Sequence, residues 1–265
     1  MKMKIFFICA FFTSSFFILN AQPLGQFPMN VMTVDELPQN VHSKLGIGAN
    51  VGGVYRFAKA QPSNNQQITD FFNRLRWGVT FNANLTYFFS ENYGAGVVYS
   101  FARHSHKIND YRHKPFPYFN PDVERKGVLE DRIIMQFIGP AFQYRYYTNF
   151  REDAFVTHIA LGYIDYRDNF FYPRWTDSET SPTPTLGGRE KAISGAFGIH
   201  AGIGYDYALS ETWALGVQLA VLIGTRSNER RTTESGQVAN INLVNSNQVD
   251  NLARVELTVG LRFNQ

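Results

Sequence analysis

Three consecutive residues near the middle of the chain have the side-chain types that catalysis or metal binding requires. These are His104, Ser105 and His106, with Asp110 and His113 close behind them. A histidine beside a serine can activate the hydroxyl as a nucleophile, and clustered histidines are common metal ligands. However, they lie at the end of an alternating segment, and adjacent residues of a strand point to opposite faces. We therefore expect solvated loop histidines here, with no catalytic residue, no metal site and no cofactor.

A second set of polar residues is spread along the chain, and its members recur at alternate positions opposite large apolar residues. The set comprises Arg56, Arg76, Asn82, Asn84, Arg145, His158, His200, Asp206, Arg254, Glu256 and Arg262. If these residues share one narrow interior, their charges must be paired, because an unpaired buried charge is costly. Arg254 and Glu256 lie two residues apart on one face, and we expect Asp206 at the depth of Arg145 and Arg262. The sequence predicts an internal ion-pair network with a structural role, and transport is the less favoured alternative.

The alternation that positions these residues is clearest in the segment 193–224. From Trp213 to Ile223 every odd position is large and apolar, whereas the even positions are mostly small or polar. A period of two indicates strands, and the five residues 208–212 join the two halves as a tight turn. The second face is too rich in glycine for an ordinary water-facing surface. Lipid outside the strands and a narrow, filled interior would explain both faces.

The same alternation recurs in eight segments. We expect strands over 44–57, 75–89, 93–102, 132–147, 154–166, 193–207, 213–224 and 254–263, with a bulge at Pro140. Three connections are short, and four are long and polar, including 59–70, 105–130 and 225–251. Short and long connections alternate strictly, as they do in membrane barrels. The predicted fold is all-β: an eight-stranded antiparallel up-and-down transmembrane β-barrel with short periplasmic turns and long outer loops.

Aromatic residues at the ends of the predicted strands separate a membrane barrel from a soluble eight-stranded barrel of similar topology. Such rims are typical of a bilayer interface. The predicted girdle consists of Trp77, Tyr87, Tyr93, Tyr147, Tyr207 and Trp213. Tyr87, Tyr147 and Tyr207 also follow one another at 60-residue intervals, each at the entry to a short turn. The girdle favours the membrane barrel.

The N-terminus predicts export. Lys2 and Lys4 precede an apolar run that ends near Ala21, the pattern of a secretory signal peptide. We therefore divide the chain into a signal peptide (1–21), an irregular periplasmic lead-in (22–43) and the barrel (44–265). Cleavage would lower the net charge from +3 to +1 and remove the only cysteine, Cys9. A nearly neutral chain without cysteines gives no reason to expect nucleic-acid binding or disulfides.

The signal segment, the Ser-Glu-x-aromatic turns at Ser90 and Ser210, and the terminal strand 258–263 together resemble the small outer-membrane β-barrel family of OmpA/OmpX-type and opacity-protein-like barrels. The resemblance covers residues 44 to 263. It implies recognition of the C-terminal strand, which ends in Phe263, by the barrel-assembly machinery. Two residues follow that phenylalanine, which departs from the family pattern. The family includes adhesins, structural barrels and a few enzymes, so the resemblance concerns architecture.

The expected function is a structural or surface-interaction role through the long outer loops, in the outer membrane of a diderm bacterium after Sec-type export. A small-solute channel or transporter is the first alternative, and a lipid-modifying enzyme such as a lipid A hydrolase is the second. The expected partners are outer-membrane lipid and lipopolysaccharide, whose phosphates suit the loop cations, together with an extracellular ligand. These cations include Lys107, Lys126, Arg189, Lys191 and Arg230.

Overall fold

The structure is a computed structural model that describes residues 44–57, 65–113, 125–148, 153–177, 181–185, 188–243 and 250–265. The predicted signal peptide and lead-in lie outside these residues. The described elements are β1 (Leu45–Arg56), α2 (Gln66–Leu75), β2 (Trp77–Phe88), β3 (Tyr93–His113), β4 (Arg125–Tyr147), β5 (Ala154–Asp177), β6 (Ser181–Thr185), β7 (Arg189–Ala208), β8 (Trp213–Arg226), β9 (Asn228–Thr233), β10 (Val238–Asn242), β11 (Asp250–Asn251) and β12 (Arg254–Asn264). The single described helix is too short and too polar to cross a membrane.

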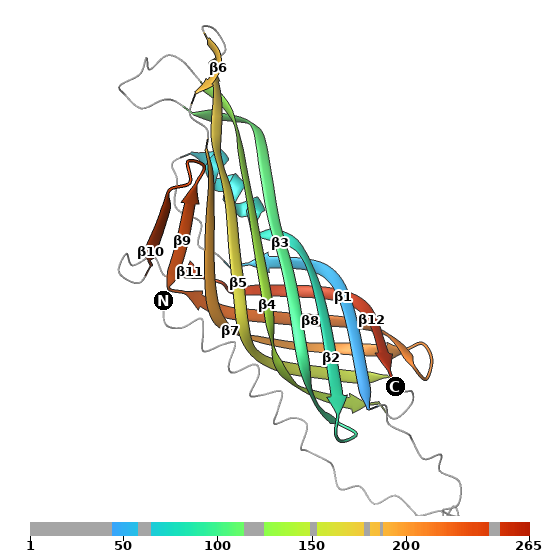
Figure 1. Ribbon diagram of the computed structural model, residues 1–265. Helices are drawn as coiled ribbons and strands as arrows, with labels where there is room; N and C mark the ends of the chain where they lie inside the picture. The colour runs from blue at the N-terminus through green and yellow to red at the C-terminus, as the bar shows by residue number, and fades with distance from the viewer. Residues whose placement is uncertain are drawn as a thin grey trace, which may run out of the picture. The chain divides into compact units, whose positions relative to one another are not determined.

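Eight of these strands close into a ring in the order β1-β2-β3-β4-β5-β7-β8-β12, and β12 pairs with β1 to complete it (Figure 1). Every pairing is antiparallel. The predicted eight-stranded barrel is therefore confirmed. Closure matters because it leaves no strand edge within the ring whose backbone groups lack partners.

Alternate residues of each strand form the outer and the inner face of the barrel. On β8 the even positions are buried and most of the odd ones are exposed, with Trp213 46% and Val217 49% accessible. The same apolar exterior runs around the ring, where Val79 on β2 and Leu257 on β12 are each at least 60% exposed. On most strands the band spans about ten residues, the length with which a tilted strand crosses a bilayer.

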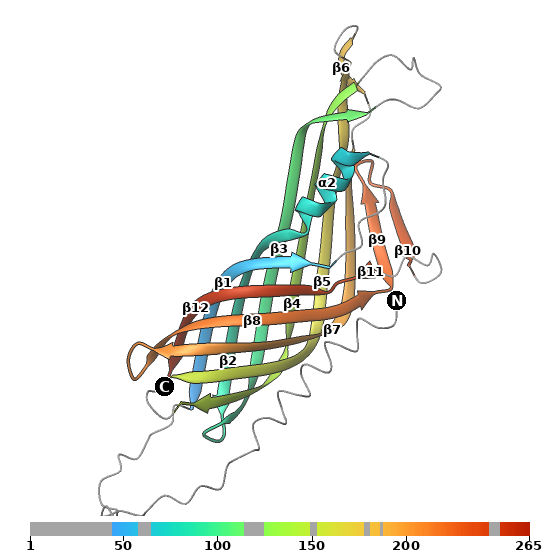
Figure 2. The ribbon, with the colours of Figure 1, turned by 180° about the vertical axis from the view of Figure 1, so that it is seen from behind.

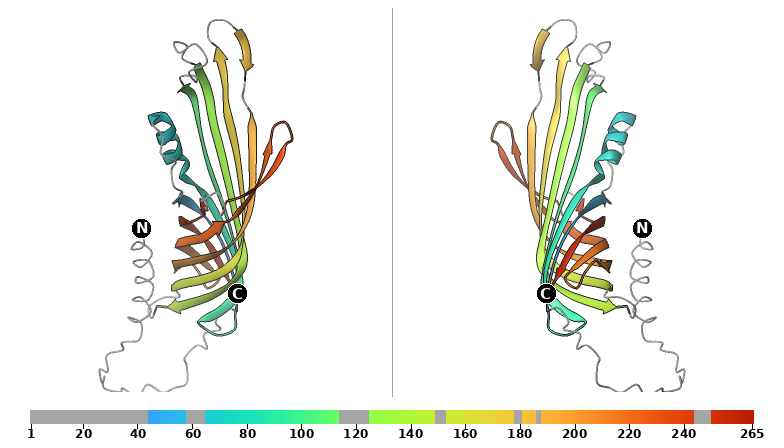
Figure 3. Two further views of the ribbon diagram at one scale, coloured as in Figure 1. Left: turned by 90° about the vertical axis from the view of Figure 1, so that its left-hand side faces the viewer. Right: turned by 90° about the vertical axis from the view of Figure 1, so that its right-hand side faces the viewer.

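Four neighbouring strands continue far beyond this band. β3, β4, β5 and β7 have 20 to 24 residues, whereas β1, β2, β8 and β12 have 11 to 14. At 3.3 Å per residue, the difference corresponds to roughly 30 Å of additional strand. We call this projecting part, residues 103–113, 125–136, 165–177 and 189–195, the outer wall. Figure 3 shows its green and yellow strands rising well above the blue and red ones.

The outer wall corrects several predicted boundaries. The expected loop 105–130 is largely the paired ends of β3 and β4, and β5 continues eleven residues past the expected end at Tyr166. The expected loop 225–251 contains a hairpin, β9–β10, that pairs with β7 from Glu190 to Ile193. Backbone pairing, rather than an apolar pattern, maintains these segments as strands.

The expected loop between β1 and β2 contains the helix α2. It begins after Asn65, whose side chain accepts a hydrogen bond from the backbone N–H of Gln67, a standard N-cap. Phe71 and Leu75 are four residues apart on its buried face. Figure 2 shows α2 beside the projecting part of β3, where the Phe71 ring lies 5.4 Å from that of His106.

The predicted bulge at Pro140 is wrong. The registers of β4 with β3 and with β5 pass Pro140 without a shift, and the shifts occur higher, at 108–111 and 128–130. A Cβ at Gly139 would lie 2.3 Å from the Leu161 carbonyl oxygen and 2.7 Å from the Gly162 Cα. Two facing glycines thus let β4 and β5 approach closely beside the proline, so the missing N–H donor is accommodated without an extra residue.

Candidate functional site

The centre of the barrel is filled by a polar group that we call the plug: Thr80, Asn82, Ser100, His200, Arg254 and Glu256. All six side chains come from inward-facing strand positions, and each residue is at most 4% exposed. Glycines at other inward positions, such as Gly48 and Gly216, leave the space that long polar side chains need. A Cβ at Gly216 would lie 2.5 Å from an Asp206 carboxylate oxygen.

The carboxylate of Glu256 is the hub of the plug. Arg254 Nε donates to Oε1 at 2.6 Å, and Ser100 Oγ lies 3.1 Å from the same oxygen. Asn82 Nδ2 donates to Oε2 at 2.8 Å, and Thr80 Oγ1 lies 3.3 Å away. The Arg254 guanidinium continues to Ser100 Oγ at 2.6 Å and the Met135 carbonyl oxygen at 3.4 Å. The charges are paired and hydrogen-bonded, as a buried ion pair must be.

A histidine pair connects the plug to the short-turn end. His158 Nε2 and His200 Nδ1 are 2.9 Å apart, and His200 Nε2 lies 3.8 Å from Glu256 Oε2. The His200 ring also stacks on Phe137, with centroids 5.4 Å apart. Below this pair Arg262 lies 3.5 Å from the Asp206 carboxylate and donates to Asn50 and Gln218.

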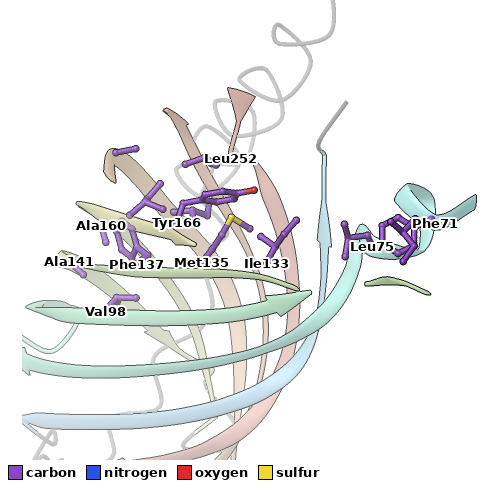
Figure 4. Close-up of a cluster of buried hydrophobic side chains, with 14 of the residues drawn as sticks. Phe71, Leu75, Val98, Ile133, Met135, Phe137, Ala141, Ala160, Tyr166 and Leu252 are labelled. Atoms are coloured by element: carbon purple, nitrogen blue, oxygen red, sulfur yellow. The ribbon is translucent and has the colours of Figure 1, made fainter. Parts of the chain in front are cut away.

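Two small polar cavities lie in the half of the barrel near the short turns. The larger has a volume of about 40 Å³, and the smaller, which is lined by Asn50 and Asn82, about 10 Å³. His158, Asn84, Gln143 and Gln218 line both cavities. These volumes have room for roughly three water molecules and one, respectively. Above them lies an apolar layer that includes Ile133, Met135, Phe137, Tyr166 and Leu252, which Figure 4 labels, and α2 adds Phe71 and Leu75 to the same cluster.

The structure brings most of the predicted interior residues into this arrangement. Arg254 with Glu256, and Asp206 with Arg262, lie together as expected. Arg145 is buried, but its Nε donates to the Glu91 carbonyl oxygen and its guanidinium lies 3.6 Å above the Phe88 ring, so it closes the short-turn end. Asn84 is half-buried at the cavity.

Two interior residues lie higher, and one of them is a correction. Arg56 is half-buried at the other end of β1, where its Nη1 lies 3.4 Å from the Tyr166 hydroxyl. Arg76 is not in the interior network: it caps the C-terminus of α2, and its Nη1 donates to the hydroxyl of the outward-facing Tyr55. The predicted strand 75–89 begins two residues before β2 and so includes the last residue of α2 and its C-cap, Arg76.

The girdle needs one correction as well. Trp77, Tyr87, Tyr93, Tyr207 and Trp213 are all 42–65% exposed on the outer surface. Tyr147 instead lines the larger cavity, and its neighbour Tyr146, 42% exposed, occupies the outer face. The 60-residue recurrence of tyrosines therefore matches the positions of the turns, but it does not show which residues of β4 face outward.

The three residues with catalytic side-chain types do not converge. His104 is fully buried inside the ring, Ser105 is exposed on the opposite face, and His106 packs against Phe71. They belong to β3 and not to a loop, so the expectation of solvated histidines is wrong for His104. Among the described residues no group of three or more His, Cys, Asp or Glu side chains is arranged to hold a metal ion.

One cluster was missed because its members were expected in a loop. Asp131 on β4 is 3% exposed, pairs across the strands with His106, and lies beside Asp168 of β5. Burial raises the pKa of Asp131 to about 9, and the charge and the hydrogen bond of Asp168 act in the same direction. Burial and the Arg74 guanidinium lower the pKa of His106. The pair Asp131–His106 is therefore uncharged at neutral pH.

The raised pKa predicts a pH-dependent stability. Folding favours the protonated form of Asp131, so its contribution to the free energy of unfolding is complete below pH 4. That contribution is lost as the pH rises towards 9, by up to about 1.4 kcal/mol per pH unit. Asp131→Asn keeps a donor for Asp168 and cannot ionise. Urea unfolding in lipid vesicles should show that the wild type loses stability between pH 5 and pH 8. We expect Asp131→Asn to lose much less over the same range. Asp165→Asn, on the outer surface, is the control, and an equal pH slope in wild type and Asp131→Asn would contradict the assignment.

Comparisons with known proteins give no close relative in sequence. No protein-family model and no curated protein matches the chain. Among solved structures, the chain is similar to a major outer membrane protein from Thermus thermophilus (TM-score 0.48, 12% identity, 84% of this chain and 99% of that one). It is also similar to the outer membrane protein OprG from Pseudomonas aeruginosa (TM-score 0.43, 12% identity, 84% and 96%) and to Neisserial surface protein A (TM-score 0.42, 13% identity, 83% and 97%).

The closed ring, its apolar exterior and its polar interior decide the class of the protein. The chain folds as an eight-stranded antiparallel transmembrane β-barrel. The activity of such a barrel depends on its own side chains, because barrels of one architecture serve unrelated functions.

Proposed function

We propose that this outer-membrane barrel is a closed membrane anchor that acts at the cell surface by binding through its outer wall. The proposal places the short turns in the periplasm and the outer wall outside the cell, after export by the N-terminal segment and insertion through the C-terminal strand. The observation that carries it is a combination: a barrel filled at its centre by the plug, and four strands that continue beyond the lipid-facing band.

The plug argues against conduction. An eight-stranded barrel has an interior just wide enough for side chains, and here the buried Arg254–Glu256 pair and the apolar layer above it occupy that space. His158 lines both cavities of the periplasmic half, and His200, Arg254 and Glu256 line neither of them. A solute would have to displace a hydrogen-bonded ion pair, which is energetically expensive.

The outer wall argues for binding. Building strands beyond the membrane costs chain entropy, and a wall is not needed to close the barrel, since β1, β2, β8 and β12 end at the band. Surface-exposed extensions supported by a rigid scaffold are common places for recognition. The separation of Ser105 from His104 and His106 removes the specific reason for considering a lipid-modifying enzyme.

Conductance and trimming together test the proposal. In planar bilayers the purified wild type is expected to give no stable channels. For the binding role, residues 172–188 are replaced by an Asn-Gly turn that joins the paired residues Phe171 and Arg189. Bacteria that display the wild type should adhere to a panel of immobilised extracellular-matrix proteins and polysaccharides more strongly than bacteria that display the trimmed barrel at the same surface level. Stable wild-type channels, or equal adhesion of both forms, would refute the proposal.

A further inference from the structure

The outward face of the outer wall carries cations immediately above the lipid-facing band. The last apolar positions there include Tyr99 and Phe101 on β3 and Tyr163 on β5. The next outward positions are Arg103 on β3 and, beyond Asp165, Arg167 on β5. Lys107 and Arg132 follow one or two outward positions higher. We call these four residues, Arg103, Lys107, Arg132 and Arg167, the cation cluster.

Strand register shows that the cluster is compact. Arg132 faces Ser105 on one side and Asn169 on the other. Arg103 and Lys107 are therefore its diagonal neighbours on β3, and Arg167 is its diagonal neighbour on β5. Diagonal neighbours on one face of a sheet lie about 7–8 Å apart. Three cations thus surround a fourth on one exposed surface.

The charges of this surface are only partly neutralised. Arg132 lies 3.7 Å from the Glu130 carboxylate, and Arg167 lies 2.8 Å from that of Asp165. Both arginine side chains still have more than 40% of their surface accessible. In the described part of the chain, Arg103 and Lys107 are exposed and have no ion pair or side-chain hydrogen bond. Four cations against two carboxylates leave a net positive surface.

The opposite side of the barrel lacks such a surface. On β1, β2, β8 and β12 the described outward positions at the same rim are aromatic, aliphatic or uncharged, among them Tyr55, Trp77 and Thr225. Among the described strand residues, the outward-facing cations at this rim therefore lie on the side that bears the outer wall, whereas Arg76, the C-cap of α2, donates to the Tyr55 hydroxyl on the other side.

We propose that the cation cluster binds the phosphate groups of phosphorylated lipids in the outer leaflet. A membrane lipid reaches this surface without leaving the bilayer, since its acyl chains can lie against Tyr99, Phe101 and Tyr163 while its headgroup meets the cations directly above. Guanidinium groups bind phosphate through paired, charge-assisted hydrogen bonds, and a lysine adds a compact charge. The inference rests on the proposed orientation, with the outer wall outside the cell, and it names a lipid partner for the wall.

Lipid binding can be measured by native mass spectrometry of the protein released from phosphatidylcholine vesicles that contain lipid A. Arg103→Gln/Lys107→Gln removes the two cations that have no carboxylate partner. Lys44→Gln/Arg74→Gln removes the same charge from exposed positions outside the cluster and is the matched control. We expect the cluster variant to bind lipid A about tenfold or more weakly, the control to bind like the wild type, and Arg103→Lys to retain most of the binding.

Two further arms identify the chemistry. Dephosphorylated lipid A should bind wild type and cluster variant equally weakly, and inorganic phosphate should not compete at concentrations that leave the vesicles intact. Equal lipid A binding by the cluster variant and the control, or no preference for the phosphorylated lipid, would overturn the inference. If the wild type conducts or its wall does not mediate adhesion, yet lipid A binding depends on Arg103 and Lys107, the proposed function fails and this inference stands.

Discussion

Replacement of Arg254 by methionine is expected to destabilise the barrel by about 3–5 kcal/mol. The side chain is fully buried and supplies the shortest hydrogen bond to Glu256, 2.6 Å from Nε to Oε1. Methionine fills a similar volume but leaves a buried carboxylate with only neutral donors and His200. Urea unfolding in lipid vesicles, followed by tryptophan fluorescence, measures the loss.

A double variant at Arg254 and Glu256 separates the effect of the ion pair from the effect of packing. Arg254→Met combined with Glu256→Leu removes both charges, and a buried pair replaced by apolar residues of similar volume is often close to neutral. The double variant should therefore recover most of the stability lost by Arg254→Met. Arg167→Met, which breaks the exposed pair with Asp165, should cost about 0–1 kcal/mol. If the double variant lost as much stability as Arg254→Met and Glu256→Leu lose together, the plug would stabilise the barrel by shape alone.

The sequence was sufficient to predict the ring, and to place Arg254 and Glu256 on one inward face, because both depend on a period of two. Wherever lipid lies on one side and a narrow interior on the other, the two faces differ strongly in residue type, as on β8 and β12. The pairing of Arg254 with Glu256 followed from two inward positions on one strand and from the cost of a buried charge.

The outer wall could not be predicted in this way. Above the membrane both faces of β3 and β4 meet water or a mixed surface, so Lys107 to His113 show no alternation and read as a loop. The missed cluster around Asp131 follows from this error. Tyr147 was assigned to the wrong face for a related reason: a phase error of one residue exchanges the two faces of a strand. In α2, Ile68, Phe71, Phe72 and Leu75 have the i, i+3, i+4, i+7 spacing of an amphipathic helix, so the sequence held a signal for it that the polar loop assignment of 59–70 overlooked.

A second large effect is expected at the contact that holds α2 against the inner face of the outer wall. Phe71 of α2 is fully buried, and it belongs to the cluster that also contains Tyr111 and Leu129 on the inner face of the wall. Phe71→Ala deletes most of this contact, and burial losses of this kind cost about 3–5 kcal/mol. A ten-residue helix has little stability of its own in water, so this loss should act mainly by releasing α2 from the wall.

Limited proteolysis measures this release, because trypsin can cut after Arg74 and Arg76 only when the end of α2 opens. A loss of about 3 kcal/mol raises the open population, and with it the cleavage rate, about a hundredfold. Phe72→Ala, at the partly buried neighbouring position, is the matched control and should raise the rate much less. The ring itself should stay folded, with an unchanged urea midpoint, since its strands are paired independently of α2. Equal cleavage in both variants would mean that Phe71 does not hold the helix against the wall, whereas a lower urea midpoint would mean that α2 and the barrel unfold as one unit.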